Sequence, residues 1–228
     1  MFLGDKKLLM RNVYLIVIPY FLRRFFDDYL SLGFPSYYKE KGVVFIHIPK
    51  AAGTSFAYHL YGRSIAHLPG EFLKRSNAEE FDRCVKFAIS RNPYSRLVSS
   101  YRFLKQGGTD IVPVDSPEQY QIADFESFER FVLSWLRDKD VDVLDFCLKR
   151  QAYFLRGVKS DLDYLGKVEE IEDTVSWLSQ YHIADFSDKN RTGESVDYKD
   201  YYKNDMVRRL VYDIYREDFE MFGYSEFL

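Results

Sequence analysis

Short apolar runs alternate along this chain with segments in which apolar residues recur every three or four positions. The runs at 43–48 (VVFIHI) and 85–90 (VKFAIS) are rich in β-branched and aromatic residues, as is typical of strands buried on both faces of a parallel sheet. Helical spacing follows each run, at 54–62 and at 92–104, and the second of these helices starts with an asparagine cap and a proline. The pattern therefore predicts two strand-to-helix units of one sheet.

The remaining periodicity predicts more elements of both kinds. We expect further strands at 63–68 and within 162–171, and further helices at 77–83, 125–136, 172–181 and 207–215. Between 105 and 124 the chain carries turn residues and no hydrophobic period, so a long surface loop is expected there, with Asp124 as the cap of the helix that follows. The predicted fold class is α/β: a P-loop-like, mainly parallel sheet flanked by helices.

The N-terminal segment raises the question of membrane contact. Residues 8–26 (LLMRNVYLIVIPYFLRRFF) contain an uncharged stretch of eleven residues, which Pro19 interrupts. A membrane-spanning helix needs about 20 apolar residues, and the arginines that follow this stretch, with no small-residue cleavage site, argue against a signal peptide. Two interpretations stay open: a helix packed on the core, and a basic, aromatic segment lying on a membrane surface. We divide the chain into an N-terminal helical extension (1–41) and one main domain (42–228).

Composition narrows the class of protein. With 228 residues and 46% hydrophobic content, the chain can bury one large core. A formal net charge of −3 weighs against a nucleic-acid binder, which needs a broad basic face. Cys84 and Cys147 show neither a disulfide framework nor zinc-ligand spacing, so a reducing compartment is the simpler interpretation. We expect a cytoplasmic protein, membrane-associated if the N-terminal segment lies on a bilayer.

The stretch 45–60 (FIHIPKAAGTSFAYHL) predicts an anion-binding loop. A tight turn between a buried strand and a helix presents unpaired backbone N–H groups and the positive end of the helix dipole, and phosphate binds at such places. The turn supplies a positive charge from Lys50, an open approach over Ala51, Ala52 and Gly53, and hydroxyls from Thr54 and Ser55. It differs from the pattern GxxxxGK[ST], because its lysine precedes the glycine by three positions. The alternative is an ordinary loop with a surface lysine.

A second anion site is predicted at 89–101 (ISRNPYSRLVSSY). Arg91 closes the strand, where its guanidinium can grip a phosphate with two hydrogen bonds, and Ser99 lies two helical turns beyond Asn92. An arginine in a turn and a serine on a helix would by themselves be structural more often than not. Together with the first loop they predict a ligand with two phosphate groups at the carboxyl edge of the sheet.

The two motifs together resemble the sulfotransferase family that includes the carbohydrate O-sulfotransferases. The first motif is HIPKAAGTS (47–55) and the second is RNPYSRLVSSY (91–101). The resemblance continues through GKVEEIED (166–173) to the C-terminal segment and covers residues 43 to 224. It implies transfer of a sulfuryl group from 3′-phosphoadenylyl sulfate (PAPS) to a hydroxyl of a carbohydrate, with the bisphosphate PAP as the second product and no metal. It also implies that the first loop holds the 5′-phosphosulfate, that the second holds the 3′-phosphate, and that Lys50 neutralises charge in the transition state.

The resemblance also implies a general base. Of the four histidines, His47 is expected in the core and His59 near the buried face of its helix, while His182 has no motif around it. His67 follows a predicted strand, and the family often has a histidine there with a glutamate four residues later. His67 is therefore the first candidate base and Glu71 the second, and a structural or acceptor-positioning role for His67 stays open.

Further expectations concern the acceptor and the nucleotide. Arg191, in a segment at 188–198 that loosely matches a family loop over the nucleotide, is a candidate contact of the 3′-phosphate. A glycan, including a polysaccharide, or another hydroxyl-bearing compound is the expected acceptor. Residues 110–145 carry ten acidic and three basic side chains, which disfavours a highly charged polyanion if this segment borders the groove; a solvated face is the alternative.

Two rival functions belong to other classes. A P-loop-like kinase or nucleotide-binding protein should show the lysine directly before serine or threonine and an acidic metal ligand ending a strand, and neither is evident. A non-catalytic glycan-binding scaffold would not need Lys50, Arg91 and Ser99 together. Because no transmembrane anchor is apparent, we expect a bacterial sulfotransferase rather than a Golgi-resident one.

Overall fold

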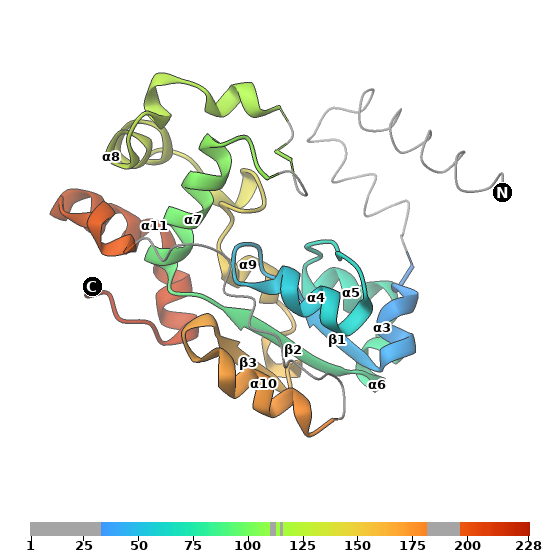
Figure 1. The fold of residues 1–228 in the computed structure, drawn as a ribbon. Helices are drawn as coiled ribbons and strands as arrows, with labels where there is room; N and C mark the ends of the chain where they lie inside the picture. The colour runs from blue at the N-terminus through green and yellow to red at the C-terminus, as the bar shows by residue number, and fades with distance from the viewer. Residues whose placement is uncertain (1–32, 110–112, 115, 182–196) are drawn as a thin grey trace, which may run out of the picture.

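A computed structural model describes residues 33–109, 113–114, 116–181 and 197–228. Its centre is a parallel sheet of β1 (Val43–Ile46), β2 (Val85–Ser90) and β3 (Tyr164–Lys167), in the order β1-β2-β3 (Figure 1). Val43 pairs with Val85, and Phe87 pairs with Tyr164, so all carboxyl ends meet at one edge. The predicted α/β class with a parallel sheet is confirmed.

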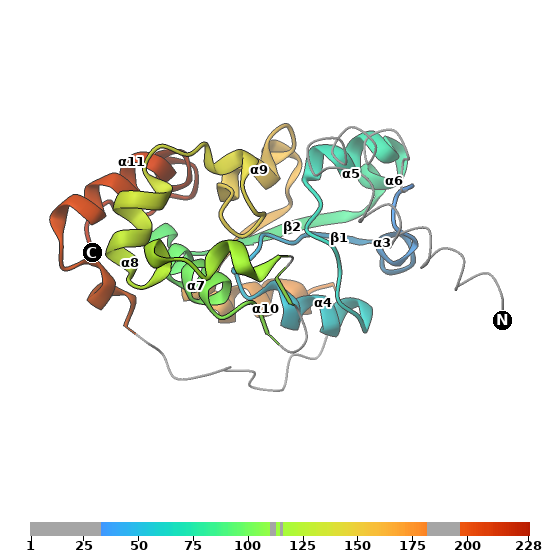
Figure 2. The same cartoon turned by 90° about the horizontal axis from the view of Figure 1, so that it is seen from above.

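Helices cover both faces of the sheet. They are α3 (Ser36–Lys41), α4 (Gly53–Tyr61), α5 (Gly70–Ser76), α6 (Ala78–Arg83), α7 (Pro93–Lys105), α8 (Phe128–Arg130), α9 (Gln151–Leu155), α10 (Ile171–Ser179) and α11 (Asp205–Phe222). A π-helix, Phe131–Leu136, continues α8, and η7 (Tyr198–Tyr202) precedes α11. Figure 2 shows α4 and α10 on one side of the strands and α5, α6 and α9 on the other. This two-sided cover explains why β1 and β2 read as nearly unbroken apolar runs.

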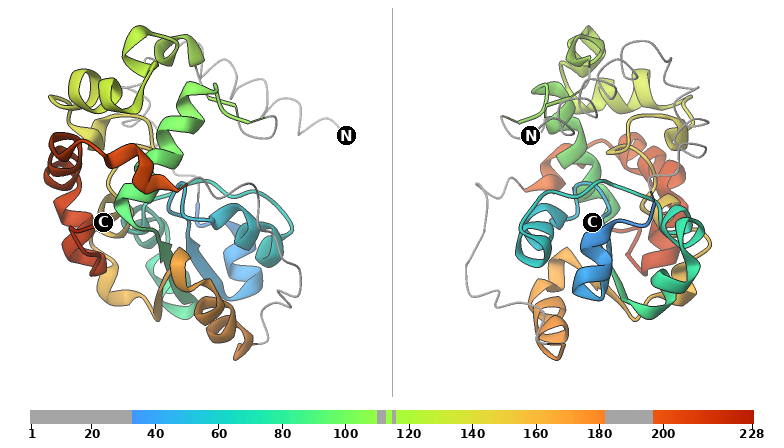
Figure 3. Two further views of the ribbon diagram at one scale, coloured as in Figure 1. Left: turned by 60° about the vertical axis from the view of Figure 1, so that its left-hand side comes forward. Right: turned by 90° about the vertical axis from the view of Figure 1, so that its right-hand side faces the viewer.

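A second hydrophobic core lies beyond the sheet. Many of its buried members come from α7, from α8 and its π-helical continuation, and from α11, among them Leu104, Phe131 and Val211. Figure 3 shows α7 rising from the sheet toward α8, with α11 alongside. The sheet edge with its loops therefore lies at the foot of α7, between the two cores.

Two local predictions were wrong. Residues 63–68 form no strand: they connect α4 to α5 in irregular backbone, because the segment has only Ile65, Ala66 and Leu68 as apolar residues and Pro69 then caps the next helix. Ser127, rather than Asp124, caps α8, and its side chain accepts a hydrogen bond from the N–H of Arg130. The expected loop at 105–124 is interrupted by two short 3-10 helices, Pro117–Tyr120 and Ala123–Phe125.

The N-terminal segment at 8–26 lies outside the described residues. Within the ranges the structure describes, no helix is both long and apolar enough to cross a bilayer. α3 packs on β1 and α4, and its Tyr38 is buried in the core around the sheet. The division at residue 41 stays a prediction.

Candidate active site

The loop between β1 and α4 has an unusual backbone. Within it, the φ angles of Lys50 and Ala52 are 64° and 58°. A residue with a Cβ rarely adopts positive φ, and such strain gathers at functional sites. No side chain caps the N-terminus of α4, which begins at Gly53. The first N–H groups of this helix are therefore available to an anion.

Gly53 fixes this loop against His47. A Cβ placed on Gly53 would overlap the imidazole ring of His47, which is buried as the sequence predicted. The small residue is therefore needed for close packing behind the loop, in addition to any approach of a ligand in front of it.

Replacing Gly53 with alanine is expected to destabilise the fold by about 1 to 3 kcal/mol, because the added methyl group overpacks a filled site. Urea unfolding measures this change. Gly33→Ala is the matched control, since a Cβ there meets nothing within 4 Å. Equal denaturation midpoints for the two variants would show that His47 moves aside freely.

Arg91 joins the two predicted loops. Its Nη1 donates to the backbone oxygen of Lys50 at 3.3 Å, and its Nε donates to Oγ of Ser95 at 2.9 Å. Ser99, half-buried, lies one helical turn beyond Ser95 on the same face of α7. Two loops that are 41 positions apart in sequence thus form one continuous surface.

The backbone of Arg91 is held by Gln151 at the start of α9. The side-chain oxygen of Gln151 accepts from the N–H of Arg91 at 2.9 Å, and its amide nitrogen donates to the carbonyl of Arg91 at 2.8 Å. The carboxylate of Asp218 on α11 in turn accepts from the N–H groups of Gln151 and Ala152, both at 2.9 Å. Sequence reasoning missed Gln151 and Asp218, which no local motif marks.

Arg96 supports the first loop from behind. It is fully buried on α7, and its Nε donates to the carbonyl of Pro49 at 2.9 Å while its Nη1 donates to the carbonyl of Lys149 at 2.8 Å. Its Nη2 is buried with no hydrogen-bond partner among the described residues. Sequence reasoning missed this residue too, although an arginine on the core face of a helix is itself a signal.

Positive charge accumulates at this edge. Burial lowers the pKa of Lys50, and the nearby positive charges of Arg91 and Arg96 lower it further. Burial also lowers the pKa of both arginines, with Glu169 opposing the shift at Arg91 and Asp218 opposing it at Arg96. Three crowded cations cost free energy until an anion neutralises them, so the site is suited to an anionic ligand.

The amine of Lys50 lies against α7. Its Nζ is 4.2 Å from the centroid of the Phe103 ring, a cation–π distance. Thr54 is exposed and Ser55 half-buried at the start of α4. The same space is therefore bordered by the Lys50 side chain, the backbone of the loop between β1 and α4, and the part of α7 that carries Phe103.

His67 contacts the chain just beyond β1. Its Nδ1 lies 2.9 Å from the carbonyl of His47, so Nδ1 carries the proton and Nε2 keeps its lone pair. The ring lies between those of His47 and Phe146, with centroids at 4.0 and 4.8 Å. Burial lowers the pKa of His67 to about 4, and the positive charges of Arg96 and Lys50 contribute. The imidazole is therefore neutral at pH 7.

Other predicted residues lie elsewhere. Glu71 is exposed in the first turn of α5, where its carboxylate is 3.9 Å from Nη1 of Arg75. His59 is exposed on α4, so its expected place near a buried face was wrong: the core side of that helix is filled by Phe56, Ala57 and Leu60. Arg191 and His182 lie outside the described residues. Among the residues described, no group of histidine, cysteine or acidic side chains is arranged to hold a metal.

Comparisons with known proteins identify the family to which the chain belongs. Residues 37–225 match the model of a family described as the sulfotransferase family. Carbohydrate sulfotransferase 12 of Xenopus laevis is 25% identical over 218 residues, covering 82% of this chain and 52% of the relative. Carbohydrate sulfotransferase 12 of Mus musculus is 24% identical over 211 residues, covering 79% of this chain and 50% of the relative. The chain thus spans about half the length of these curated relatives, and no solved structure gives a significant match.

Proposed function

Because the chain belongs to the sulfotransferase family, we propose that it transfers a sulfuryl group from PAPS to a hydroxyl group of a carbohydrate. The observation that carries this proposal is the hydrogen bond of 3.3 Å from Arg91 to the backbone of Lys50, which makes one surface of two anion-binding loops. PAPS has a matching pair of anionic groups, one at each end of its ribose.

The donor would lie across this surface. The 5′-phosphosulfate would accept hydrogen bonds from the first N–H groups of α4 and neutralise Lys50. The 3′-phosphate would bind Arg91 and Ser99, with Arg191 as a further candidate. Gln151 and Arg96 would keep both loops in place before the donor arrives, which lowers the entropy cost of binding.

The reaction would be an in-line displacement at sulfur. The acceptor oxygen forms a bond to sulfur as the bond from sulfur to the bridging phosphate oxygen breaks, and PAP leaves with that electron pair. Nε2 of His67 takes the acceptor proton, while Lys50 stabilises the charge that grows on the leaving oxygen. Both residues lie near the end of β1, because Nδ1 of His67 is 2.9 Å from the carbonyl of His47 and Lys50 follows His47 by three positions.

The acceptor is specified only to its chemical class. Both relatives are named as carbohydrate sulfotransferases, and we extend that acceptor class to this chain without choosing a sugar or a position. A peripheral membrane contact through residues 8–26 and a cytoplasmic location stay predictions, because that segment lies outside the described residues.

A donor-dependent acceptor screen tests the proposal. The full chain is incubated with ³⁵S-labelled PAPS and a panel of mono- and polysaccharides, with ATP labelled on its terminal phosphate in parallel. We expect ³⁵S in a carbohydrate and PAP formed in equal amount. Transfer of labelled phosphate instead would favour the P-loop-like kinase alternative. The matched control is Arg209→Gln, which changes an exposed side chain on α11 and should stay active.

A further inference from the structure

A carboxylate borders the second of the two predicted anion loops. Glu169 lies in the short 3-10 helix Val168–Glu170, which directly follows β3. The last residues of β2 and β3 pair with each other, so Arg91 and Glu169 leave neighbouring strands at the same edge of the sheet. Lys50 follows β1, which lies on the other side of β2. The chain segment at Arg91 therefore lies between a positively charged loop and a carboxylate.

Glu169 is held in this place through both of its carboxylate oxygens. Its Oε1 accepts a hydrogen bond from the backbone N–H of Asn92 at 2.9 Å, and its Oε2 accepts one from the hydroxyl of Tyr224 at 2.9 Å. The Tyr224 hydroxyl in turn lies 3.2 Å from Oγ of Ser90, at the end of β2. The carboxylate is thus fixed against the residue that follows Arg91, although Glu169 as a whole is exposed.

The protein itself bonds the N–H groups at the start of α7. The N–H of Asn92 donates to Glu169, and the next two N–H groups of the chain donate to the Asn92 side chain at 3.0 and 3.4 Å. A negative side chain is favourable at a helix N-terminus, so this arrangement is stable without a ligand. A 3′-phosphate at this loop would therefore depend on the side chains of Arg91 and Ser99.

The charge of Glu169 acts on the same region as that of Arg91. Burial lowers the pKa of Arg91, and the Glu169 carboxylate opposes this shift. Burial raises the pKa of Tyr198, and there the Glu169 carboxylate raises it further while Arg91 lowers it. A phosphate beside Arg91 would consequently be attracted by the guanidinium and repelled by the carboxylate.

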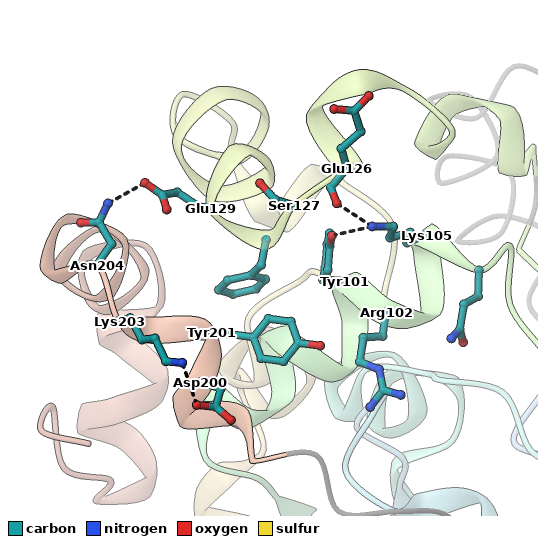
Figure 4. A pocket seen from close by; sticks show the side chains of 12 residues that line it. Tyr101, Arg102, Lys105, Glu126, Ser127, Glu129, Asp200, Tyr201, Lys203 and Asn204 are labelled. Atoms are coloured by element: carbon teal, nitrogen blue, oxygen red, sulfur yellow. Dashed lines mark hydrogen bonds and ion pairs between the residues drawn. The ribbon is translucent and has the colours of Figure 1, made fainter.

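Other carboxylates around α7 are placed differently. Figure 4 shows three of them in an open pocket beside the C-terminal end of α7: Glu126, Glu129 and Asp200. They are bound there by Arg130, Asn204 and Lys203 respectively. Asp218 is buried and accepts from the first N–H groups of α9. Of these carboxylates, that of Glu169 is the one bonded to the second loop.

We propose that Glu169 sets the affinity of the second loop for a 3′-phosphate, by repelling the phosphate that Arg91 attracts. The inference rests on the proposed donor and adds a residue that weakens its binding. PAPS and PAP have the same 3′-phosphate, so the repulsion weakens both and favours release of the product. An effect that is equal for the ground state and the transition state changes affinity without changing the barrier of the chemical step.

Glu169→Gln tests this role, because glutamine keeps the length of the side chain and an oxygen that can accept from Asn92, but not the charge. Calorimetric titration at low ionic strength compares it with the wild type. We expect PAP to bind about three- to tenfold more tightly to the variant. AMP, which lacks the 3′-phosphate, should bind equally to both. The gain for PAP should shrink as salt screens the repulsion.

Glu172→Gln is the matched control, since it removes the same charge from an exposed position in the first turn of α10. It should leave both affinities nearly unchanged. A merely structural role of Glu169 predicts weaker binding in Glu169→Gln, so tighter binding isolates the effect of charge. Unchanged or weaker binding of PAP would overturn the inference, as would an equal gain for AMP and PAP.

The wild-type titration separates this inference from the proposed function. If the wild type binds PAP more tightly than AMP and Glu169→Gln changes neither affinity, the role of Glu169 is wrong and the donor assignment stands. If neither the wild type nor the variant binds either nucleotide, the proposed donor is wrong, and the role of Glu169 fails with it.

Discussion

Lys50→Ala is expected to lower turnover by about 100- to 1,000-fold, the cost typical of removing one group that stabilises transition-state charge. The affinity for PAP should fall much less. Lys50 is crowded by Arg91 and Arg96 and lies against the Phe103 ring, so its charge acts in a poorly solvated site where new negative charge is strongly stabilised. Turnover at saturating PAPS and calorimetry with PAP separate the two effects.

Lys41→Ala is the control for the loss of a positive charge, because Lys41 is exposed at the end of α3. It should behave like the wild type in both measurements. If Lys50→Ala changes only the apparent donor affinity, the lysine is a ground-state contact and its assigned role is wrong.

His67→Ala is expected to lose about 100- to 10,000-fold in turnover, the range typical of general-base catalysis. The variant should still bind PAP, because neither anion loop contains His67. The imidazole is well placed for the role: Nδ1 bonds to the His47 carbonyl and Nε2 keeps its lone pair. Rates at saturating donor and acceptor, with PAP binding measured in parallel, check the prediction.

His59→Ala, on an exposed part of α4, is the matched control and should keep normal turnover. Near-normal turnover of His67→Ala would transfer the base role to Glu71 or another carboxylate. If the variant turns over normally and needs far more acceptor, His67 positions the acceptor.

The same histidine sets a pH dependence. An unperturbed imidazole has a pKa of about 6.5, but burial lowers the pKa of His67 to about 4. Protonation removes the lone pair that accepts the proton, so kcat/KM should stay constant from neutral pH downward and fall only as the pH approaches 4. The pH profile of kcat/KM reports the pKa of the group in the free enzyme. A limb with its midpoint near the unperturbed value would show that the site is more hydrated than its packing against Phe146 indicates.

The two strand-to-helix loops were predictable as structure because their signals are local. A buried strand, small residues and a helix start follow one another within 45–60, and the asparagine cap and proline mark the second unit. The side chain of Asn92 does accept from the N–H groups of Tyr94 and Ser95, at 3.0 and 3.4 Å. The strand expected at 63–68 failed because two or three apolar residues in a short segment fit either a strand or a packed connection.

The supporting residues could not be predicted, because their partners are distant in sequence. Gln151 meets Arg91 across 60 positions, and Asp218 meets Gln151 across 67. Arg96 reaches Pro49 across 47. Each partner is a backbone group, which any residue type supplies, so no pattern in the sequence specifies it.

Calorimetric titration with PAP and with AMP tests the central claim most directly, that two joined loops bind two anionic groups of one nucleotide. We predict micromolar affinity for PAP and clearly weaker binding of AMP, which lacks the 3′-phosphate. Arg91→Ala should weaken PAP by about 10- to 100-fold, the cost of a lost hydrogen bond to a charged group, and leave AMP nearly unchanged. Equal affinity of the wild type for AMP and PAP would contradict the account, because the second loop would then bind no phosphate.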